Sequence, residues 1–339
     1  MFFSVEIILG YLLWHRKVES YSSIHYTIKR VNKYFLKPKF WPDNKITHTI
    51  FLPKSPYVPD SYLGYSDLPG EYLVSWGIEG NDKKHQFRVT INNNGNRITT
   101  FHPELYENKK EIWIFGNSNT FGWGNNDETT FPFILQNFLE DFQIINFADN
   151  GYGNIHAYLK LKKEIDLKSP PRFIVIVYGD YFNIRNVAAP SRLKEYNLYN
   201  TLWRDDLLLF THPRANIIDN ELKIDYVQLS KHKIKNIQES DPEKTYQREV
   251  TKKILREISL ISSKNNVKII LAFISGDDND SVVEYAMELG YKICDIRASK
   301  KYNEHDNFKP YDAHPGPLAQ NHYAYKIYNA ISRTIESGK

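Results

Sequence analysis

The chain has 339 residues, 41% of them hydrophobic and 25% charged, and a formal net charge of only +4. These values are typical of a globular protein, and no dense run of Lys and Arg accompanies a nucleic-acid-binding motif, so we expect no nucleic-acid partner. The single cysteine, Cys294, excludes an intramolecular disulfide and a four-cysteine metal site. Its apolar neighbours predict a small, buried strand residue.

The N-terminal segment, residues 1–45, is predicted to be helical and partly basic. Residues 1–14 are mostly apolar, but a helix of that length reaches only about 21 Å, short of the ~30 Å hydrocarbon core of a bilayer. Glu6 interrupts the run, and no basic start or cleavage site marks a secretory signal. We predict an amphipathic helix that packs on the protein or contacts a membrane surface through residues 1–17. A cytoplasmic location is favoured, and membrane association or a cell-envelope location follows if the segment is the end of a longer anchor.

Residues 46–108 have the pattern of a small antiparallel β module. Proline and glycine are frequent, and hydrophobic side chains alternate with polar ones in two runs, residues 72–78 and 87–91. Period-two alternation is typical of half-buried strands. The dipeptides Gly80-Asn81 and Asn94-Gly95 are turn signals beside these runs.

From residue 109 to 339, short apolar runs alternate with amphipathic segments. Five apolar runs predict buried parallel strands, at residues 112–115, 144–147, 173–177, 267–273 and 291–296. Amphipathic helices are predicted at about 131–140, 154–165, 246–258, 282–289 and 318–335. We therefore predict an α/β fold, a three-layer sandwich with a mainly parallel five-stranded sheet. Residues 187–242 interrupt this rhythm without a clear period, and predict an insertion that is either a substrate-shaping lid or a structural cap.

Two short motifs point to chemistry at the open end of this sheet. An apolar strand ends abruptly in Gly116-Asn117-Ser118, which exposes a hydroxyl at a strand-to-helix turn near backbone N–H groups. A helix-capping serine is the structural alternative. Asp312 and His314 precede the last predicted helix. Serine, aspartate and histidine on one sheet can form an activated nucleophile, although a lone histidine there can equally be a surface residue.

Four sequence blocks, taken together and in order, resemble the SGNH (GDSL-type) serine hydrolases over about residues 111–335. The blocks are residues 116–118, 146–153, 178–183 and 312–315. Residues 60–100 are also similar to the N-terminal module of bacterial two-domain members. The resemblance implies a flavodoxin-like three-layer domain with Ser118 as the nucleophile, His314 as the general base and Asp312 as the residue that orients the imidazole.

The same resemblance implies an oxyanion hole formed by the backbone N–H groups of Ser118 and Gly151 and by the side-chain amide of Asn183. Glycine is suited to position 151 because a Cβ would crowd the substrate oxygen, while ordinary turn residues are the alternative at both later positions. Asn117 and Ile184 depart from the family pattern, which has aspartate at each position. The loss of a charge at Asn117 affects the electrostatics of the site more than its shape.

The implied activity is hydrolysis of an acyl ester through an acyl-enzyme on Ser118, with a small-molecule or carbohydrate acyl ester as substrate. Two alternatives stay open: an O-acyltransferase that uses the same triad, and a non-catalytic binding domain on the same fold. No cofactor is expected, and the sequence carries no metal-site motif or phosphate-binding loop. His322 is expected to be structural, His212 matches no motif, and the oligomeric state stays open.

Overall fold

The computed structural model describes residues 47–78, 82–195, 210–228, 240–298 and 306–336. The unit described below begins at Thr47. The helical segment predicted for residues 1–45 lies outside the described residues. Within the described ranges, no helix is both long and apolar enough to cross a membrane.

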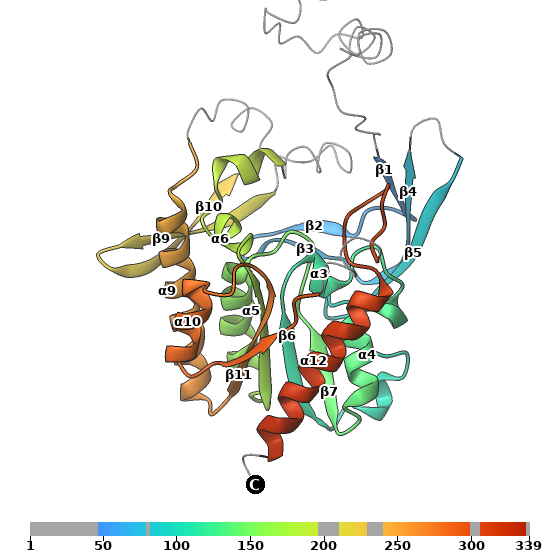
Figure 1. Ribbon diagram of the computed structural model, residues 1–339. Helices are drawn as coiled ribbons and strands as arrows, with labels where there is room; N and C mark the ends of the chain where they lie inside the picture. Colours follow the sequence, from blue (N-terminus) through green and yellow to red (C-terminus); the bar gives the residue numbers. More distant parts are fainter. Residues whose placement is uncertain (1–46, 79–81, 196–209, 229–239, 299–305, 337–339) are drawn as a thin grey trace, which may run out of the picture. The chain divides into compact units, whose positions relative to one another are not determined.

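The centre of this unit is a five-stranded parallel sheet with the strand order β12-β11-β8-β6-β7 (Figure 1). The strands are β6 (Lys110–Phe115), β7 (Phe142–Asn146), β8 (Phe173–Gly179), β11 (Lys268–Ser275) and β12 (Lys292–Asp295). In chain order this is the flavodoxin-like arrangement 2-1-3-4-5, whose topological switch point lies between the first and third strands. The predicted fold class is confirmed, and the strand ends lie within two residues of those predicted.

Helices cover both faces of the sheet and so form the outer layers of the sandwich (Figure 1). One layer comprises α5 (Asn154–Leu167), α9 (Lys244–Lys264) and α10 (Ser281–Glu288), and the other comprises α4 (Phe131–Phe138) and α12 (Pro317–Glu336). In the central strand β8, Ile174 and Ile176 pack on the first layer, whereas Val175 and Val177 pack on the second. Because every residue of β8 is buried, its sequence is a continuous apolar run.

Four short helical turns complete the connections. The helices α3 (Ser118–Phe121) and α6 (Phe182–Asn186) directly follow the carboxyl ends of β6 and β8. The 3₁₀ turns η1 (Pro103–Leu105) and η2 (Asp127–Thr129) lie before β6 and before α4. The two helices at the strand ends therefore lie at the switch point, where open parallel sheets bind their ligands.

The predicted antiparallel β strands are present in the residues before the parallel sheet. The strands β1 (Thr47–Leu52), β4 (Gly70–Ile78) and β5 (Lys84–Ile91) pair in the order β1-β4-β5, and β2 (Tyr57–Asp60) pairs with β3 (Gly64–Asp67). The alternation in β4 buries Val74, Trp76 and Ile78. The Asn94-Gly95 signal forms a turn after β5, whereas Gly80-Asn81 lies outside the described residues.

Within residues 187–242, where the sequence shows no clear period, the structure contains a β-hairpin. Its strands β9 (Thr211–Ile218) and β10 (Glu221–Gln228) pair along their whole length. The turn residues Asp219 and Asn220 have φ values of 52° and 59°, a conformation that Asp and Asn tolerate better than most residues. This Asp-Asn pair, followed by the alternating residues of β10, was the available hairpin signal. Residues 196–209 and 229–239 lie outside the description, and the role of the insertion stays a prediction.

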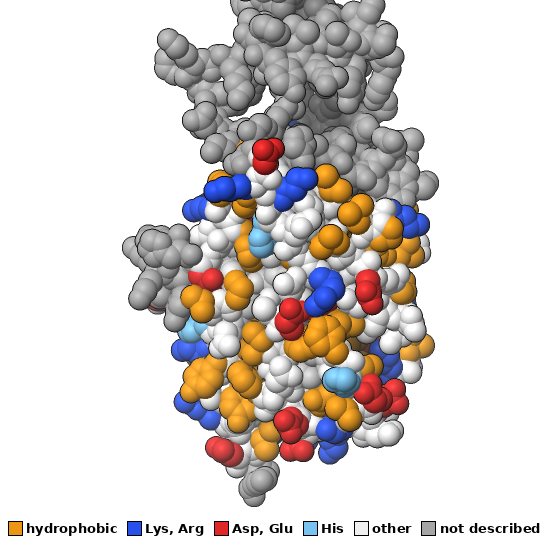
Figure 2. All heavy atoms as spheres, turned by 90° about the vertical axis from the view of Figure 1, so that its right-hand side faces the viewer, with side chains coloured by type: hydrophobic (Ala, Val, Ile, Leu, Met, Phe, Trp, Pro, Cys, Tyr) orange, Lys and Arg blue, Asp and Glu red, His pale blue; other side chains and the backbone are white. Residues whose placement is uncertain are grey.

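The surface in Figure 2 carries Lys and Arg side chains interspersed with Asp and Glu and with small groups of hydrophobic side chains. This mixture agrees with the small net charge of the chain. Cys294 lies in β12 and is 7% exposed, so the prediction of a buried strand cysteine is confirmed.

Candidate active site

Ser118 lies at a sharp junction between β6 and α3. The strand ends at Phe115, and α3 begins at Ser118 itself. A Cβ on Gly116 would lie 2.0 Å from Thr120 Oγ1, so only glycine fits this tight turn. Asn117 caps the helix, because its side-chain oxygen accepts the Asn119 backbone N–H at 3.1 Å. The N-cap is therefore Asn117, and the Ser118 hydroxyl is left for other contacts.

The structure brings Ser118, His314 and Asp312 together across 196 residues of sequence. His314 Nε2 lies 2.7 Å from Ser118 Oγ. The other ring nitrogen, Nδ1, forms a short hydrogen bond with Asp312 Oδ1, and the same carboxylate accepts the His314 backbone N–H at 2.7 Å. The imidazole is thus fixed between a hydroxyl and a carboxylate, which is the arrangement of a serine–histidine–aspartate triad.

The positions of the protons among Ser118, His314 and Asp312 follow from the charge on Asp312. Burial raises the pKa of this carboxyl, but its hydrogen bonds and its charge interaction with His314 outweigh burial, so its pKa lies below the usual value. Asp312 is therefore ionised at neutral pH and accepts a proton-bearing Nδ1. Nε2 is then the unprotonated nitrogen and accepts from the Ser118 hydroxyl. The side chains of His314 and Asp312 remain 28% and 27% exposed, so solvent reaches the group.

The nucleophile loop, defined here as residues 116–130, is tied to the segment that carries His314. Asn125 Nδ2 donates to the Pro315 carbonyl at 3.0 Å. The buried side chain of Gln320 in α12 donates to the Asn119 carbonyl at 3.0 Å and accepts the Phe131 N–H at 2.8 Å. These bonds set the distance between the serine and the histidine. Sequence reasoning missed Gln320, since a single glutamine in an amphipathic helix carries no visible signal.

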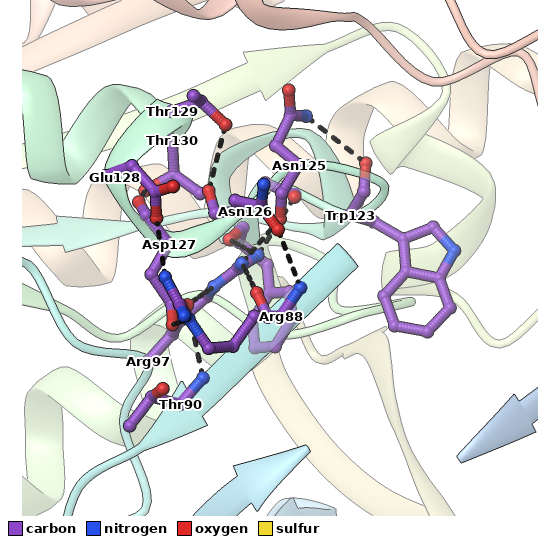
Figure 3. Close-up of polar contacts among 12 residues, drawn as sticks. Arg88, Thr90, Arg97, Trp123, Asn125, Asn126, Asp127, Glu128, Thr129 and Thr130 are labelled. Atoms are coloured by element: carbon purple, nitrogen blue, oxygen red, sulfur yellow. Dashed lines mark hydrogen bonds and ion pairs between the residues drawn. The ribbon is translucent and has the colours of Figure 1, made fainter. Parts of the chain in front are cut away.

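A second support of the nucleophile loop is Arg97, which is 1% exposed and follows β5 (Figure 3). Its guanidinium donates to Asp127 Oδ1 at 2.8 Å. It also donates to four backbone carbonyls, those of Arg88, Phe121, Gly122 and Asn125. Three of these carbonyls belong to the nucleophile loop, so one side chain determines the path of the chain directly after α3.

Gly151, the second residue predicted for the oxyanion hole, lies on the loop that follows β7. Its φ of 79° is in the left-handed region, which favours glycine. The neighbouring Asn150 is held from the antiparallel strands, because its side chain donates to the Tyr57 hydroxyl at 2.6 Å and its carbonyl accepts from the Tyr65 hydroxyl. The β2–β3 pair therefore positions the loop that carries Gly151.

Asn183, the third predicted residue, lies in α6 and is 5% exposed. Its side-chain amide donates to the Tyr178 hydroxyl at 3.2 Å, and that hydroxyl also contacts the Asp280 carboxylate at 3.3 Å. These contacts lead toward the N-terminus of α10 rather than toward Ser118. The role of Asn183 as an oxyanion donor stays a prediction. Ile184 packs as a partly buried residue against the hydrophobic core.

Two further histidines have structural environments. His212 in β9 is buried, and its ring lies 5.1 Å from that of buried His156. His322 lies in α12 beside Tyr323. Among the described residues, no cluster of three or more His, Cys, Asp or Glu side chains could hold a metal ion. Burial raises the pKa of the Cys294 thiol to about 11, so it is protonated at neutral pH.

No family model matches the chain, and no curated protein matches it. The chain is similar in fold to solved structures of G-D-S-L lipolytic proteins. One, from Veillonella parvula, is 16% identical with a TM-score of 0.39 over 66% of this chain and 98% of that one. The esterase EstA from a Pseudoalteromonas species is 12% identical with a TM-score of 0.40 over 67% and 100%.

A third structure, a carbohydrate esterase family 2 enzyme with a carbohydrate-binding domain from Corynascus thermopiles, is 13% identical with a TM-score of 0.41 over 86% of this chain and 87% of that one. Identities and TM-scores this low do not transfer an activity. The similarity concerns the fold, and the function must be argued from the geometry of the site.

Proposed function

We propose that this protein is a serine-dependent esterase of the SGNH type that forms an acyl-enzyme on Ser118. One observation carries the proposal: His314 lies between the Ser118 hydroxyl, at 2.7 Å, and the Asp312 carboxylate. A histidine held in this way can take the serine proton, and the ionised carboxylate stabilises the imidazolium that forms.

In the first half of the reaction, Ser118 Oγ attacks the acyl carbon of the ester while its proton moves to His314 Nε2. The carbonyl π electrons move to the carbonyl oxygen, giving a tetrahedral oxyanion. When this intermediate collapses, the carbon–alkoxy bond breaks and the leaving alcohol takes the proton from His314.

In the second half, water attacks the acyl-serine and gives a proton to His314. Collapse of the second oxyanion breaks the acyl–Oγ bond, and the proton returns to Ser118. The products are the carboxylic acid and the free enzyme. Oxyanion stabilisation is assigned in this proposal to the N–H groups of Ser118 and Gly151 and to a side-chain donor from the segment after β8, for which the sequence resemblance implies the Asn183 amide.

The proposal extends to acylated carbohydrates as substrates, and the aromatic surroundings of the catalytic segment support this extension. Tyr311 directly precedes Asp312, and Phe308 lies in the same segment. The His85 ring lies 4.5 Å from that of Phe308 and 6.3 Å from that of Tyr311. All three side chains are partly exposed, and such amphipathic aromatic faces suit the apolar faces of sugar rings.

The test is the Ser118→Ala variant together with a p-nitrophenyl phosphonate ester. Ser118→Ala should keep the unfolding midpoint of the wild type and lower turnover of p-nitrophenyl acetate by about 10³-fold or more. Mass spectrometry should find the phosphonyl group on Ser118 alone. Labelling of another residue, or undiminished turnover by the variant, contradicts the proposal. Acetate release from an acetylated oligosaccharide tests the carbohydrate extension separately.

A further inference from the structure

The residue after β8 that contacts the nucleophile loop is Tyr181. Its hydroxyl accepts the Asn119 side-chain amide at 2.8 Å and the Asn117 side-chain amide at 3.3 Å. These two asparagines are the immediate neighbours of Ser118 in the chain. The contact follows from topology, since β8 pairs with β6 and both strands end at the switch point.

The Tyr181 hydroxyl accepts two hydrogen bonds, and its own O–H group is left as a donor. A phenol has one O–H donor and two acceptor positions, and the two asparagine amides occupy the acceptor positions. Within the part of the chain that the structure describes, the Tyr181 hydroxyl donates to no acceptor. Burial raises the pKa of this phenol, so the proton is retained at neutral pH. The O–H hydrogen of a phenol that contacts both chain neighbours of Ser118 is therefore an unused donor.

The ring that carries this hydroxyl is fixed on several sides. The Arg185 guanidinium lies 5.1 Å from its centroid, and the Phe182 ring stacks on it at 5.0 Å. Its own backbone N–H donates to Asp180 Oδ1 at 3.0 Å. Tyr181 also packs against the hydrophobic clusters on both faces of the sheet. A donor on so constrained a ring is preorganised, which is what stabilisation of a transition-state charge requires.

From this geometry we infer that Tyr181 is a catalytic residue that donates its hydroxyl hydrogen to the oxyanion formed on Ser118, beside the backbone N–H of Ser118. The inference rests on the proposed esterase function. Asn183, the donor implied by the sequence resemblance, lies two residues further on and directs its amide to Tyr178 instead. Tyr181 therefore takes the place of the side-chain donor that the resemblance implies in the segment after β8.

The experiment compares Tyr181→Phe with a control, Tyr291→Phe, in the full chain. Tyr291 precedes β12 and is 4% exposed, and its hydroxyl donates to the Leu255 carbonyl of α9 at 2.7 Å, away from the residues of the site. With p-nitrophenyl acetate, Tyr181→Phe should lower kcat by about 10²–10³-fold with KM changed by less than about threefold. Tyr291→Phe should keep kcat within about threefold of the wild type.

A role as a mere support of the loop is tested with Asn119→Ala, which removes the closer amide but keeps the Tyr181 hydroxyl. If Tyr181 only holds Asn119, the two variants lose the same activity and the double variant loses no more, which overturns the inference. If Tyr181 is the oxyanion donor, Tyr181→Phe loses at least about tenfold more kcat than Asn119→Ala.

Labelling by the p-nitrophenyl phosphonate separates this inference from the proposed function. The phosphoryl oxygen of the probe occupies the position of the oxyanion, so Tyr181→Phe should slow labelling of Ser118 by about 10-fold or more while the labelled residue stays the same. Unchanged labelling and unchanged kcat in Tyr181→Phe overturn the role of Tyr181 alone. Absence of Ser118 labelling in the wild type overturns the esterase proposal and this inference with it.

Discussion

Replacement of Arg97 by methionine should destabilise the protein and disturb the nucleophile loop together. The guanidinium is fully buried and makes five hydrogen bonds, one to Asp127 and four to backbone carbonyls. Methionine fills much of the same space but leaves the fully buried Asp127 carboxylate without its closest cation. Breaking a buried ion pair from one side costs about 3–5 kcal/mol.

That cost is a large part of the free energy of unfolding, which is only about 5–15 kcal/mol for a typical domain. Arg97→Lys separates charge from geometry, since lysine keeps the positive charge but has three donors on one nitrogen instead of a planar fork. We expect Arg97→Lys to lose less stability than Arg97→Met and still lose activity, because the carbonyls of Phe121 and Gly122 lose the donor that fixes the end of α3.

The assay is urea unfolding of the wild type, Arg97→Met, Asp127→Asn and the double variant, with esterase turnover measured below the unfolding transition. The double variant should lose clearly less than the sum of the two single losses, because it no longer contains an unpaired buried charge. A loss below about 1 kcal/mol for Arg97→Met, or strict additivity of the two changes, would refute this account of the pair.

Two further outcomes are expected. Asn183→Ala should lower kcat by about 10²–10³-fold with a smaller change in KM if its amide reaches the oxyanion, whereas an unchanged kcat in a stable variant assigns Asn183 to the support of Tyr178. Burial lowers the pKa of His212 from about 6.5 to about 3, so the unfolded chain binds this proton first and stability falls as the pH drops below about 6.5. Between pH 8 and pH 5 this should cost about 2 kcal/mol in urea unfolding, and His212→Gln should reduce that slope; parallel slopes would exclude the effect.

Much of the fold follows from local patterns. Continuous apolar runs predict the parallel strands because both faces of the sheet are covered, and the alternation in β4 predicts a strand with one buried face. The hairpin β9–β10 was not predicted, although its second strand alternates polar and hydrophobic residues from Glu221 to Tyr226, because its hydrophobic side chains are only partly buried or exposed and the residues before it show no such alternation. The Asp219-Asn220 turn and the alternation that follows it were the two available signals.

The candidate triad could be named from sequence because Ser118, Asp312 and His314 occupy motif positions next to element ends. Tyr181 could not, because a tyrosine after an apolar strand is equally typical of a core residue. Its role depends on the two asparagines that its hydroxyl meets from another strand. A contact of this kind depends on strand order, which no single segment contains.

The same reasoning explains why the residues that hold the nucleophile loop could not be predicted from the sequence. Arg97 follows β5, Tyr181 follows β8 and Gln320 lies in α12, yet all three contact the nucleophile loop. Arg97 and Gln320 bind backbone carbonyls, which every residue has, so the residue types of their partners do not reveal these contacts. The geometry around Ser118 therefore depends on three distant segments, and changes in the antiparallel strands should affect catalysis as directly as changes in the parallel sheet.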